Sequence, residues 1–161
     1  MRINETRPFK GSVAAAFPHT VPVLTGFLVL GIAYGMLMQS KGYGAPWALL
    51  MSGVAYCGSM QFAAISLLTS AFDPLGAFVM SLLVNARHLF FSLALLPKYR
   101  GLGKLRYFMI YTLSDENFSL SSSVEPPEEV DPTQFYFAMS LLTWAYWVLF
   151  SMLGGLAGSL I

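Results

Sequence analysis

Charged residues are what this 161-residue chain has least of. Only 11% of its residues are charged, against roughly 25% in soluble domains, while 56% are hydrophobic. No Asp, Glu, Lys or Arg occurs between Lys10 and Lys41 or between Lys41 and Asp73, and Arg87 alone stands between Asp73 and Lys98. These intervals exceed the roughly 20 residues that a membrane-spanning helix needs. The composition therefore excludes an ordinary soluble domain and indicates an integral membrane protein.

Cysteine, histidine and the usual enzymatic motifs are also scarce. Cys57 is the only cysteine, so no intrachain disulfide can form and a cysteine-rich metal site is excluded. The chain has two histidines and no Walker loop, zinc spacing, glycine-rich dinucleotide turn or hydrolase triad. We therefore expect no enzyme, no cofactor and no metal. The basic residues stand in two short patches that flank apolar runs, so no nucleic-acid partner is expected.

The apolar runs are separated by short polar segments. Residues 1–17 form a polar, weakly basic N-terminal segment, and residues 124–133 form an acidic loop broken by prolines. The remaining runs have lengths suited to a lipid bilayer, and we expect membrane segments at residues 19–38, 46–72, 74–96, 105–123 and 135–161. The sequence thus predicts an all-α integral membrane protein with four to five transmembrane segments, organised as one transmembrane domain over residues 1–161.

The run 46–72 is longer than one straight span requires, and its centre is rich in small and polar residues. We expect at least one broken or re-entrant helix here, with a kink and a hairpin as the alternatives. A hairpin would satisfy the positive-inside rule, because it places residues 1–17 and the basic loop 98–106 on one side of the membrane and the acidic loop on the other. Three single crossings would separate the two basic segments.

Local signals also mark helix starts and close helix contacts. Asp73 followed by Pro74 predicts a helix start, with Asp73 as the N-cap. Small residues that allow two helices to approach closely recur in the first and last spans: Gly26, Gly31, Gly35, Gly154, Gly155 and Gly158.

Three apolar runs carry polar residues near their midpoints, where a bilayer tolerates charge least. These residues are Ser59 and Gln61 in the second run, Asn85, Arg87 and His88 in the third, and Ser114, Asp115, Glu116 and Asn117 in the fourth. Polar groups at this depth are typical of transporters and channels. The predicted substrate-binding residues are Asn85, Arg87, His88, Ser114, Asp115, Glu116 and Gln61.

Arg87 is the sharpest of these signals, because it lies only about 3 Å of helix rise from the middle of its run. An arginine at that depth costs at least about 2.5–3.5 kcal/mol and needs a carboxylate, a water-filled cavity or an anionic substrate. Two interpretations are open: a structural ion pair with Asp115 or Glu116, and a contact with the substrate.

His88 belongs to a polar stripe on one helical face, at positions 81, 85, 88 and 92. Arg87 points roughly 100° away from His88, so the two need different partners unless the helix is distorted. His88 is suited to shuttle protons near neutral pH, and a neutral histidine that bridges two helices is the alternative. Gln61 is a weaker signal, since a membrane amide often bonds a neighbouring helix.

Ser114 is the predicted N-cap of a helix whose first turn holds Asp115 and Glu116. From Ser114 to Ser123 there is only about 15 Å of helix, which is half a bilayer. A helix that begins at mid-membrane offers unpaired N–H groups to a substrate. The alternative is an amphipathic interfacial helix with its acidic side chains in water.

These segments also resemble a known family. The segment Asn85-Ala86-Arg87-His88-Leu89 resembles the N-x-R-H segment of AzlC-type branched-chain amino acid permeases, and residues 114–120 are similar to the family's T-D-E-x-F-A-L element. The stretch around Ser59-x-Gln61-Phe62 and the late stretch 144–158 also fit, in the right order over nearly the whole chain. Family members are longer, with further spans after that late stretch, so the chain is expected to be short at its C-terminus.

The resemblance implies a multi-pass secondary transporter in the lipid bilayer of the bacterial inner (plasma) membrane. It implies proton-coupled export of branched-chain amino acids such as valine, together with a small AzlD-type membrane subunit, and a homo-oligomer is compatible with it. In this hypothesis Arg87 binds the substrate carboxylate, Asp115 or Glu116 binds the amino group or carries the proton, and Asn85 and His88 line the same cavity. The competing hypothesis is a non-transporting or accessory membrane subunit in which Arg87 and Asp115 form a buried pair.

Overall fold

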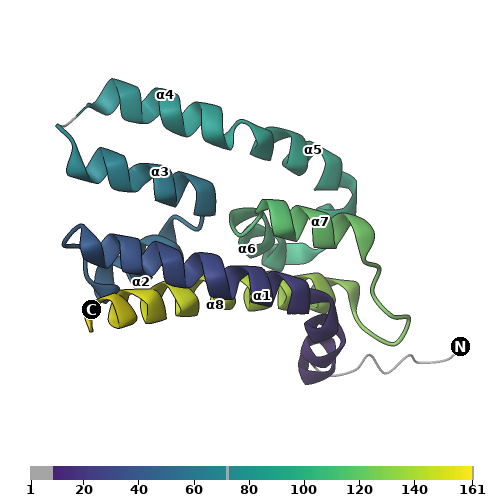
Figure 1. Ribbon diagram of the computed structural model, residues 1–161. Helices are drawn as coiled ribbons and strands as arrows, with labels where there is room; N and C mark the ends of the chain where they lie inside the picture. The colour runs from purple at the N-terminus through teal and green to yellow at the C-terminus, as the bar shows by residue number, and fades with distance from the viewer. Residues whose placement is uncertain (1–8, 72, 161) are drawn as a thin grey trace, which may run out of the picture. The chain divides into compact units, whose positions relative to one another are not determined.

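The computed structural model describes residues 9–71 and 73–160, which form helices and no strand (Figure 1). The elements are α1 (Phe9–Ser40), α2 (Ala45–Val54), α3 (Gly58–Thr69), α4 (Pro74–Asn85), α5 (Arg87–Tyr99), the 3₁₀ turn η1 (Gly103–Leu105), α6 (Arg106–Tyr111), α7 (Asp115–Ser123) and α8 (Pro132–Gly158). Three helical stretches are long and apolar enough to cross a bilayer: Phe9–Ser40, Pro74–Tyr99 and Pro132–Gly158. The prediction of an all-α, multi-pass membrane protein is confirmed.

The ends of two spans differ from the prediction. Helix α1 begins at Phe9, so part of the expected polar segment 1–17 is helical, and residues 1–8 lie outside the described residues. Pro18 and Pro22 stand inside α1, and α5 continues through Pro97 rather than ending before it. Membrane helices tolerate such prolines because neighbouring groups re-satisfy the backbone that each proline frees.

The chain divides into two compact units, which are described separately. Unit 1 comprises the residues up to Leu24 together with Phe90–Thr143, and unit 2 comprises Thr25–Leu89 together with Trp144–Ile161. Unit 1 thus holds the first part of α1, α5 to α7 and the first part of α8, whereas unit 2 holds the rest of α1, α2 to α4 and the rest of α8.

In unit 2, α2 and α3 form a re-entrant hairpin. They contain 10 and 12 residues, about 15 and 18 Å of helix, which is near half a bilayer each. The hydroxyl of Tyr43, just before α2, donates a hydrogen bond to the Leu68 carbonyl in the last turn of α3 at 3.0 Å. The outer ends of the two helices therefore lie together, and the predicted break, at residues 55–57, turns the chain back rather than kinking one long span.

A second interruption falls in the third apolar run. Asp73 is its N-cap as predicted, since its Oδ1 accepts a hydrogen bond from the Gly76 amide at 2.9 Å. Helix α4 ends at Asn85 and α5 begins at Arg87, and the intervening Ala86 carbonyl accepts a bond from the Leu89 amide at 3.2 Å. The helix is thus distorted next to Arg87.

In unit 1, α6 and α7 form a second hairpin, with six and nine residues on the two sides of a break at residues 112–114. Ser114 is the N-cap of α7 as predicted, because its Oγ accepts a bond from the Asn117 amide at 3.3 Å. The Nζ of Lys98, at the end of α5, donates to the Ser121 carbonyl near the end of α7 at 2.6 Å. The fourth run is therefore a pair of short helices that returns to its starting side, not one amphipathic helix.

The second hairpin overturns one part of the expected topology. The acidic loop was expected on the side opposite the basic loop 98–106, yet Lys98 forms an ion pair with Glu125 at an N–O distance of 2.9 Å. The two loops lie at the same end because the α6–α7 hairpin brings the chain back to the end of α5. The charge separation expected from a single crossing of residues 105–123 is therefore wrong.

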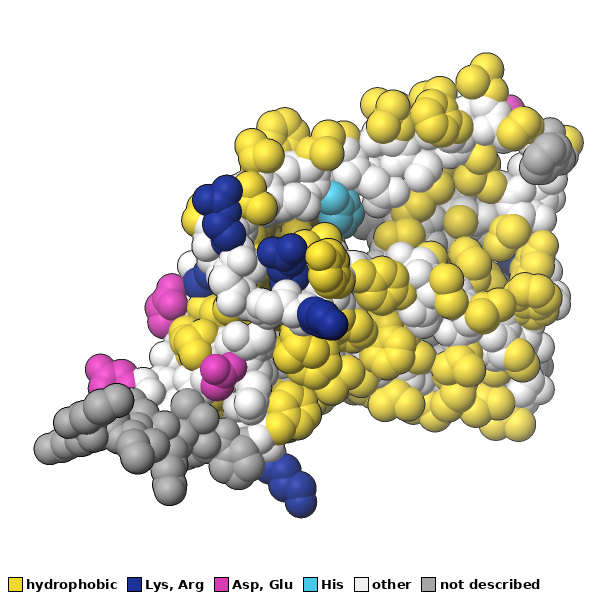
Figure 2. Space-filling view, turned by 180° about the vertical axis from the view of Figure 1, so that it is seen from behind, with side chains coloured by type: hydrophobic (Ala, Val, Ile, Leu, Met, Phe, Trp, Pro, Cys, Tyr) yellow, Lys and Arg dark blue, Asp and Glu magenta, His cyan; other side chains and the backbone are white. Residues whose placement is uncertain are grey.

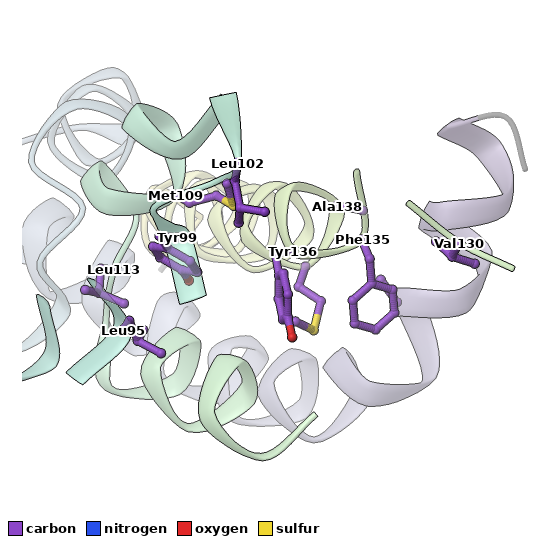
Figure 3. Packing of buried hydrophobic residues seen from close by; sticks show 11 residues of the cluster. Leu95, Tyr99, Leu102, Met109, Leu113, Val130, Phe135, Tyr136 and Ala138 are labelled. Atoms are coloured by element: carbon purple, nitrogen blue, oxygen red, sulfur yellow. The ribbon is translucent and has the colours of Figure 1, made fainter. Parts of the chain in front are cut away.

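Unit 1 has a continuous apolar core between α5, α6 and α8. Figure 3 shows Tyr99, Met109, Phe135 and Tyr136 among its members, and Met109 and Phe135 are fully buried. The Tyr99 hydroxyl also shares a hydrogen bond of 2.8 Å with the Ser121 Oγ. The apolar core and this hydrogen bond together hold the α6–α7 hairpin against α5 and α8 of unit 1.

Exposed side chains of the long helices are largely apolar. Only 6% of the most hydrophobic part of the stretch Pro74–Tyr99 is buried. Its side chains Leu75, Leu83 and Leu93 are each more than 70% exposed. Figure 2 shows one face on which hydrophobic side chains cover large areas and charged side chains gather apart from them. Such a surface matches lipid tails rather than water.

Candidate functional site

The three polar midpoints predicted from the sequence coincide with the three interruptions of the apolar helices. In unit 2, Ser59 and Gln61 follow the break between α2 and α3, and Arg87 follows the interruption at Ala86 between α4 and α5. Residues 114–117 follow the α6–α7 break in unit 1. An interrupted helix leaves backbone N–H and C=O groups without helical partners, and those groups and the polar side chains beside them offer binding chemistry inside a membrane.

Arg87 reaches the start of α3. It is the first residue of α5, is half-buried, and its Nη2 donates a hydrogen bond of 2.7 Å to the Oγ of Ser59, the second residue of α3. A helix N-terminus carries a partial positive charge and N–H donors. A guanidinium and a helix N-terminus therefore meet at Ser59, and both favour an anionic ligand.

The charge composition of unit 2 strengthens this assignment. Its sequence contains Lys41, Asp73 and Arg87 as its charged residues. Lys41 lies in the turn after α1, and Asp73 caps α4, so both stand at helix ends. Arg87 stands instead near the middle of the apolar stretch Pro74–Tyr99, where a spanning segment tolerates charge least.

Asn85 and His88 lie on the two sides of the same interruption. The Asn85 amide nitrogen Nδ2 donates to the Ser81 Oγ at 3.3 Å. His88 Nδ1 lies 3.1 Å from the Asn85 carbonyl oxygen. Because a carbonyl oxygen only accepts hydrogen bonds, Nδ1 is the nitrogen that carries the proton in this contact. His88 thus satisfies a carbonyl that the break releases.

Gln61 is almost completely buried, with 1% of its surface exposed. Its Oε1 accepts hydrogen bonds from the Cys57 backbone amide at 3.2 Å and from Trp147 Nε1 at 2.9 Å. Its Nε2 donates to the Ser52 Oγ at 3.0 Å. The structure therefore places Gln61 in bonds that span the α2–α3 break and reach α8.

In unit 1 the predicted residues are consecutive at the start of α7. Ser114, Asp115 and Glu116 are all half-buried, and the two acids occupy the first turn, where the helix dipole favours negative charge. Asn117, the next residue, is 2% exposed and bonds to the Thr112 carbonyl. This segment therefore offers carboxylates where the unit 2 segment offers a guanidinium.

Ser59 and Asn117 were recognised as polar midpoint residues in the sequence but were not included among the predicted substrate-binding residues. Ser59 is the observed partner of Arg87, and Asn117 is a bonded residue of the α6–α7 break. A usable signal existed for both, since each lies in a short polar cluster inside an apolar run and is followed closely by a phenylalanine, Phe62 or Phe118.

Half-length helices that turn back at polar breaks, together with three apolar stretches of spanning length, define a multi-pass membrane protein. The chain belongs to the AzlC family: the family model described as "AzlC protein" matches residues 22–161. The family resemblance noted from the sequence motifs is confirmed.

Among similar proteins, the branched-chain amino acid transport protein AzlC of Bacillus subtilis (strain 168) is 41% identical over 157 residues, which are 98% of this chain and 62% of that protein. An uncharacterized membrane protein of Haemophilus influenzae is 37% identical over 98% of this chain and 65% of its own length. One of Helicobacter pylori (strain 26695) is 38% identical over 89% of this chain and 63% of its own length. The chain thus spans less than two thirds of the length of these relatives. No solved structure matches it significantly.

Proposed function

We propose that the chain is a secondary transporter, or the greater part of one, that exports branched-chain amino acids such as valine in a proton-coupled manner. The membrane architecture and the name of the Bacillus subtilis relative support the substrate class. The observation that carries the proposal is the 2.7 Å contact between the Arg87 guanidinium and Ser59 at the N-terminus of α3.

A free amino acid offers a carboxylate that these groups suit. A guanidinium binds a carboxylate through two parallel N–H bonds, and a helix N-terminus adds backbone donors. In the proposal Arg87 takes the substrate carboxylate, and Ser59 orients the guanidinium and adds a hydroxyl. Binding of an anionic substrate would offset the free-energy cost of placing an arginine at this depth in the membrane.

The remaining polar residues receive roles by their chemistry. Asp115 and Glu116 are acids suited to an amino group or a coupling proton, and Ser114 shapes the helix start that presents them. His88 and Asn85 stand at the same helix interruption as Arg87 and are assigned to the substrate path. An imidazole ring can both accept and donate a proton, so His88 is also proposed as a carrier of the coupling proton.

The proposal includes a small AzlD-type membrane subunit and allows a homo-oligomer. Helix surfaces with exposed leucines, such as Leu75, Leu83 and Leu93, suit contact with lipid or with another membrane helix. We assign the protein to the inner membrane of a bacterial cell.

Efflux from cells loaded with valine- and leucine-containing dipeptides tests the function. The chain is compared alone and with a small AzlD-type subunit, and Arg87→Ala and Arg87→Lys are compared with Arg100→Ala, which removes an exposed loop arginine. We expect Arg87→Ala to lower efflux about 10- to 100-fold, the effect of losing hydrogen bonds to a charged group, and Arg100→Ala to leave it within about two-fold.

Arg87→Lys should recover only part of the activity, because a lysine cannot make the bidentate contact. Efflux that is independent of Arg87 would remove the carboxylate assignment. No efflux from folded, inserted chain under either condition would contradict the transporter itself and support an accessory membrane subunit.

A further inference from the structure

Both re-entrant hairpins contain a buried carboxamide side chain close to their break. Gln61 is the fourth residue of α3 and Asn117 the third residue of α7, and they are 1% and 2% exposed. Each therefore lies in the first turn of the second helix of its hairpin, where the chain has just turned back.

Each carboxamide bonds across its own break and also to α8. Gln61 joins Ser52 on α2 and the Cys57 amide in the break, and it accepts a bond from Trp147 on α8. The Asn117 Nδ2 donates to the Thr112 carbonyl just after α6 at 2.6 Å, and its Oδ1 accepts from the Thr143 hydroxyl on α8 at 2.8 Å.

The two hairpins match in the residue that follows as well. Phe62 packs edge-on against Tyr34 of α1, with ring centroids 5.4 Å apart. Phe118 stacks on Phe91 of α5, with centroids 4.5 Å apart. In each hairpin a carboxamide thus holds the break and the next side chain anchors the returning helix to a neighbouring element of its unit.

We propose that Gln61 and Asn117 are corresponding positioning residues: each fixes the geometry of one hairpin at its break, so that the start of the second helix is presented to substrate, and neither contacts substrate itself. A buried amide that already serves two or three protein groups has little bonding capacity left for a ligand. The consequence for transport rests on the proposed function, but the structural role does not. Gln61 is thereby assigned to the support of Ser59 and the Arg87 site.

Cys57 makes the role of Gln61 measurable. It is the only cysteine in the chain, lies within the α2–α3 break, is partly exposed, and gives its backbone N–H to Gln61. The rate at which N-ethylmaleimide modifies Cys57 in native membranes therefore reports on the opening of this break and requires no transport.

Gln61→Met keeps a similar side-chain volume and removes all three hydrogen bonds. We expect it to raise the modification rate of Cys57 about five-fold or more, since local opening frees groups that the fold protects. Gln61→Glu keeps the acceptor for Trp147 and Cys57 and should raise the rate less. The matched control is Asn117→Leu, which removes the corresponding bonds in unit 1 and should leave the rate within about two-fold.

Transport selectivity supplies the second readout. Because a positioning residue does not touch the substrate, Gln61→Met should lower valine, leucine and isoleucine efflux by the same factor. A changed ratio among the three, or an unchanged Cys57 rate at normal membrane levels, would make Gln61 a ligand or a bystander and overturn the proposal. Where Gln61→Met fails to insert, Trp147→Phe removes a single bond and should produce a smaller rise in rate. If the chain transports nothing, the labelling experiment still decides the structural role.

Discussion

The backbone of Gly35 on α1 lies directly against the backbone of Gly155 on α8 in unit 2. A methyl group added at Gly35 would overlap the Ser151 carbonyl oxygen and the Gly155 amide, and one at Gly154 would overlap Ile32. In a membrane, helices associate through such close packing, because lipid tails are as apolar as the side chains they would replace. The contact therefore depends on glycine at these positions.

Gly35→Ala should destabilise the protein, because the new methyl group must push the two helices apart. We expect a loss of about 1–3 kcal/mol, typical of overpacking, seen as a lower unfolding temperature of the purified protein in detergent. Gly26→Ala is the control on the same helix, since no atom lies within 4 Å of the added carbon. It should be neutral or stabilising by about 0.5–1 kcal/mol through helix propensity. Equal unfolding temperatures for the two variants would contradict the contact.

Tyr56, in the α2–α3 break, has a φ angle of 38°, in the left-handed region that favours glycine. Its ring is buried, so a direct change to glycine would combine relief of strain with loss of packing. Tyr56→Ala and Tyr56→Gly both lose the ring, and their difference isolates the backbone. We expect Tyr56→Gly to be more stable by about 1 kcal/mol in thermal unfolding. A Tyr56→Ala variant at least as stable as Tyr56→Gly would show that the turn relaxes without cost.

Much of the fold could be predicted from the sequence, because the hydrophobic runs mark the spans and the polar residues within them mark positions where a helix starts or breaks. Long intervals with few charges predicted the membrane spans, and polar residues near the midpoints predicted the break before Ser59 and the helix start at Ser114, whereas the interruption at Arg87 was not predicted. The N-caps Asp73 and Ser114 followed from side chains that bond locally, so a few neighbouring residues sufficed.

What the sequence did not reveal depends on contacts between distant residues. The bond from Arg87 to Ser59 spans 28 residues, and the one from Trp147 to Gln61 spans 86. The return of α7 was also missed, because a run of the length of 105–123 fits one crossing, an interfacial helix or a hairpin equally well. The assignment of substrate-binding roles remains a prediction for all seven residues: Gln61, Asn85, Arg87, His88, Ser114, Asp115 and Glu116.

Glu125 should make the end of the α6–α7 hairpin sensitive to acid. The hydrogen bond and charge of Lys98 lower the pKa of Glu125 below its ordinary value of 4.5. A carboxyl group whose pKa is lower in the folded state stabilises the fold above its ordinary pKa, and that contribution is lost as the pH falls through the folded value. The wild type should therefore unfold at a slightly higher temperature than Glu125→Gln at pH 7.

The same difference should disappear well below pH 4.5, where the carboxyl is protonated in both states. It should also shrink in 1 M salt, because the pair is exposed on the Glu125 side and the Debye length is then only about 3 Å. Glu128→Gln, which changes a neighbouring exposed acid, is the control. A difference that persists at low pH would mean that Glu125 acts through packing rather than charge.

The two hairpins predict a specific membrane sidedness. Helix α1 crosses once, the α2–α3 hairpin returns, the stretch Pro74–Tyr99 crosses back, and the α6–α7 hairpin returns again. Gly101 and Glu128 should therefore face the same side of the membrane, and Lys41, after one crossing, the other. Single cysteines at these exposed positions, each in a Cys57→Ser background, are labelled in intact cells with a membrane-impermeant maleimide.

We expect Gly101→Cys and Glu128→Cys to share one labelling pattern, protected in intact cells and labelled after lysis, because the positive-inside rule places the basic loop in the cytoplasm. Lys41→Cys should be labelled in intact cells. Opposite patterns for Gly101→Cys and Glu128→Cys would mean that residues 106–123 cross the bilayer. That result would conflict with the 2.9 Å pair between Lys98 and Glu125, since a crossing would hold those two groups about 30 Å apart.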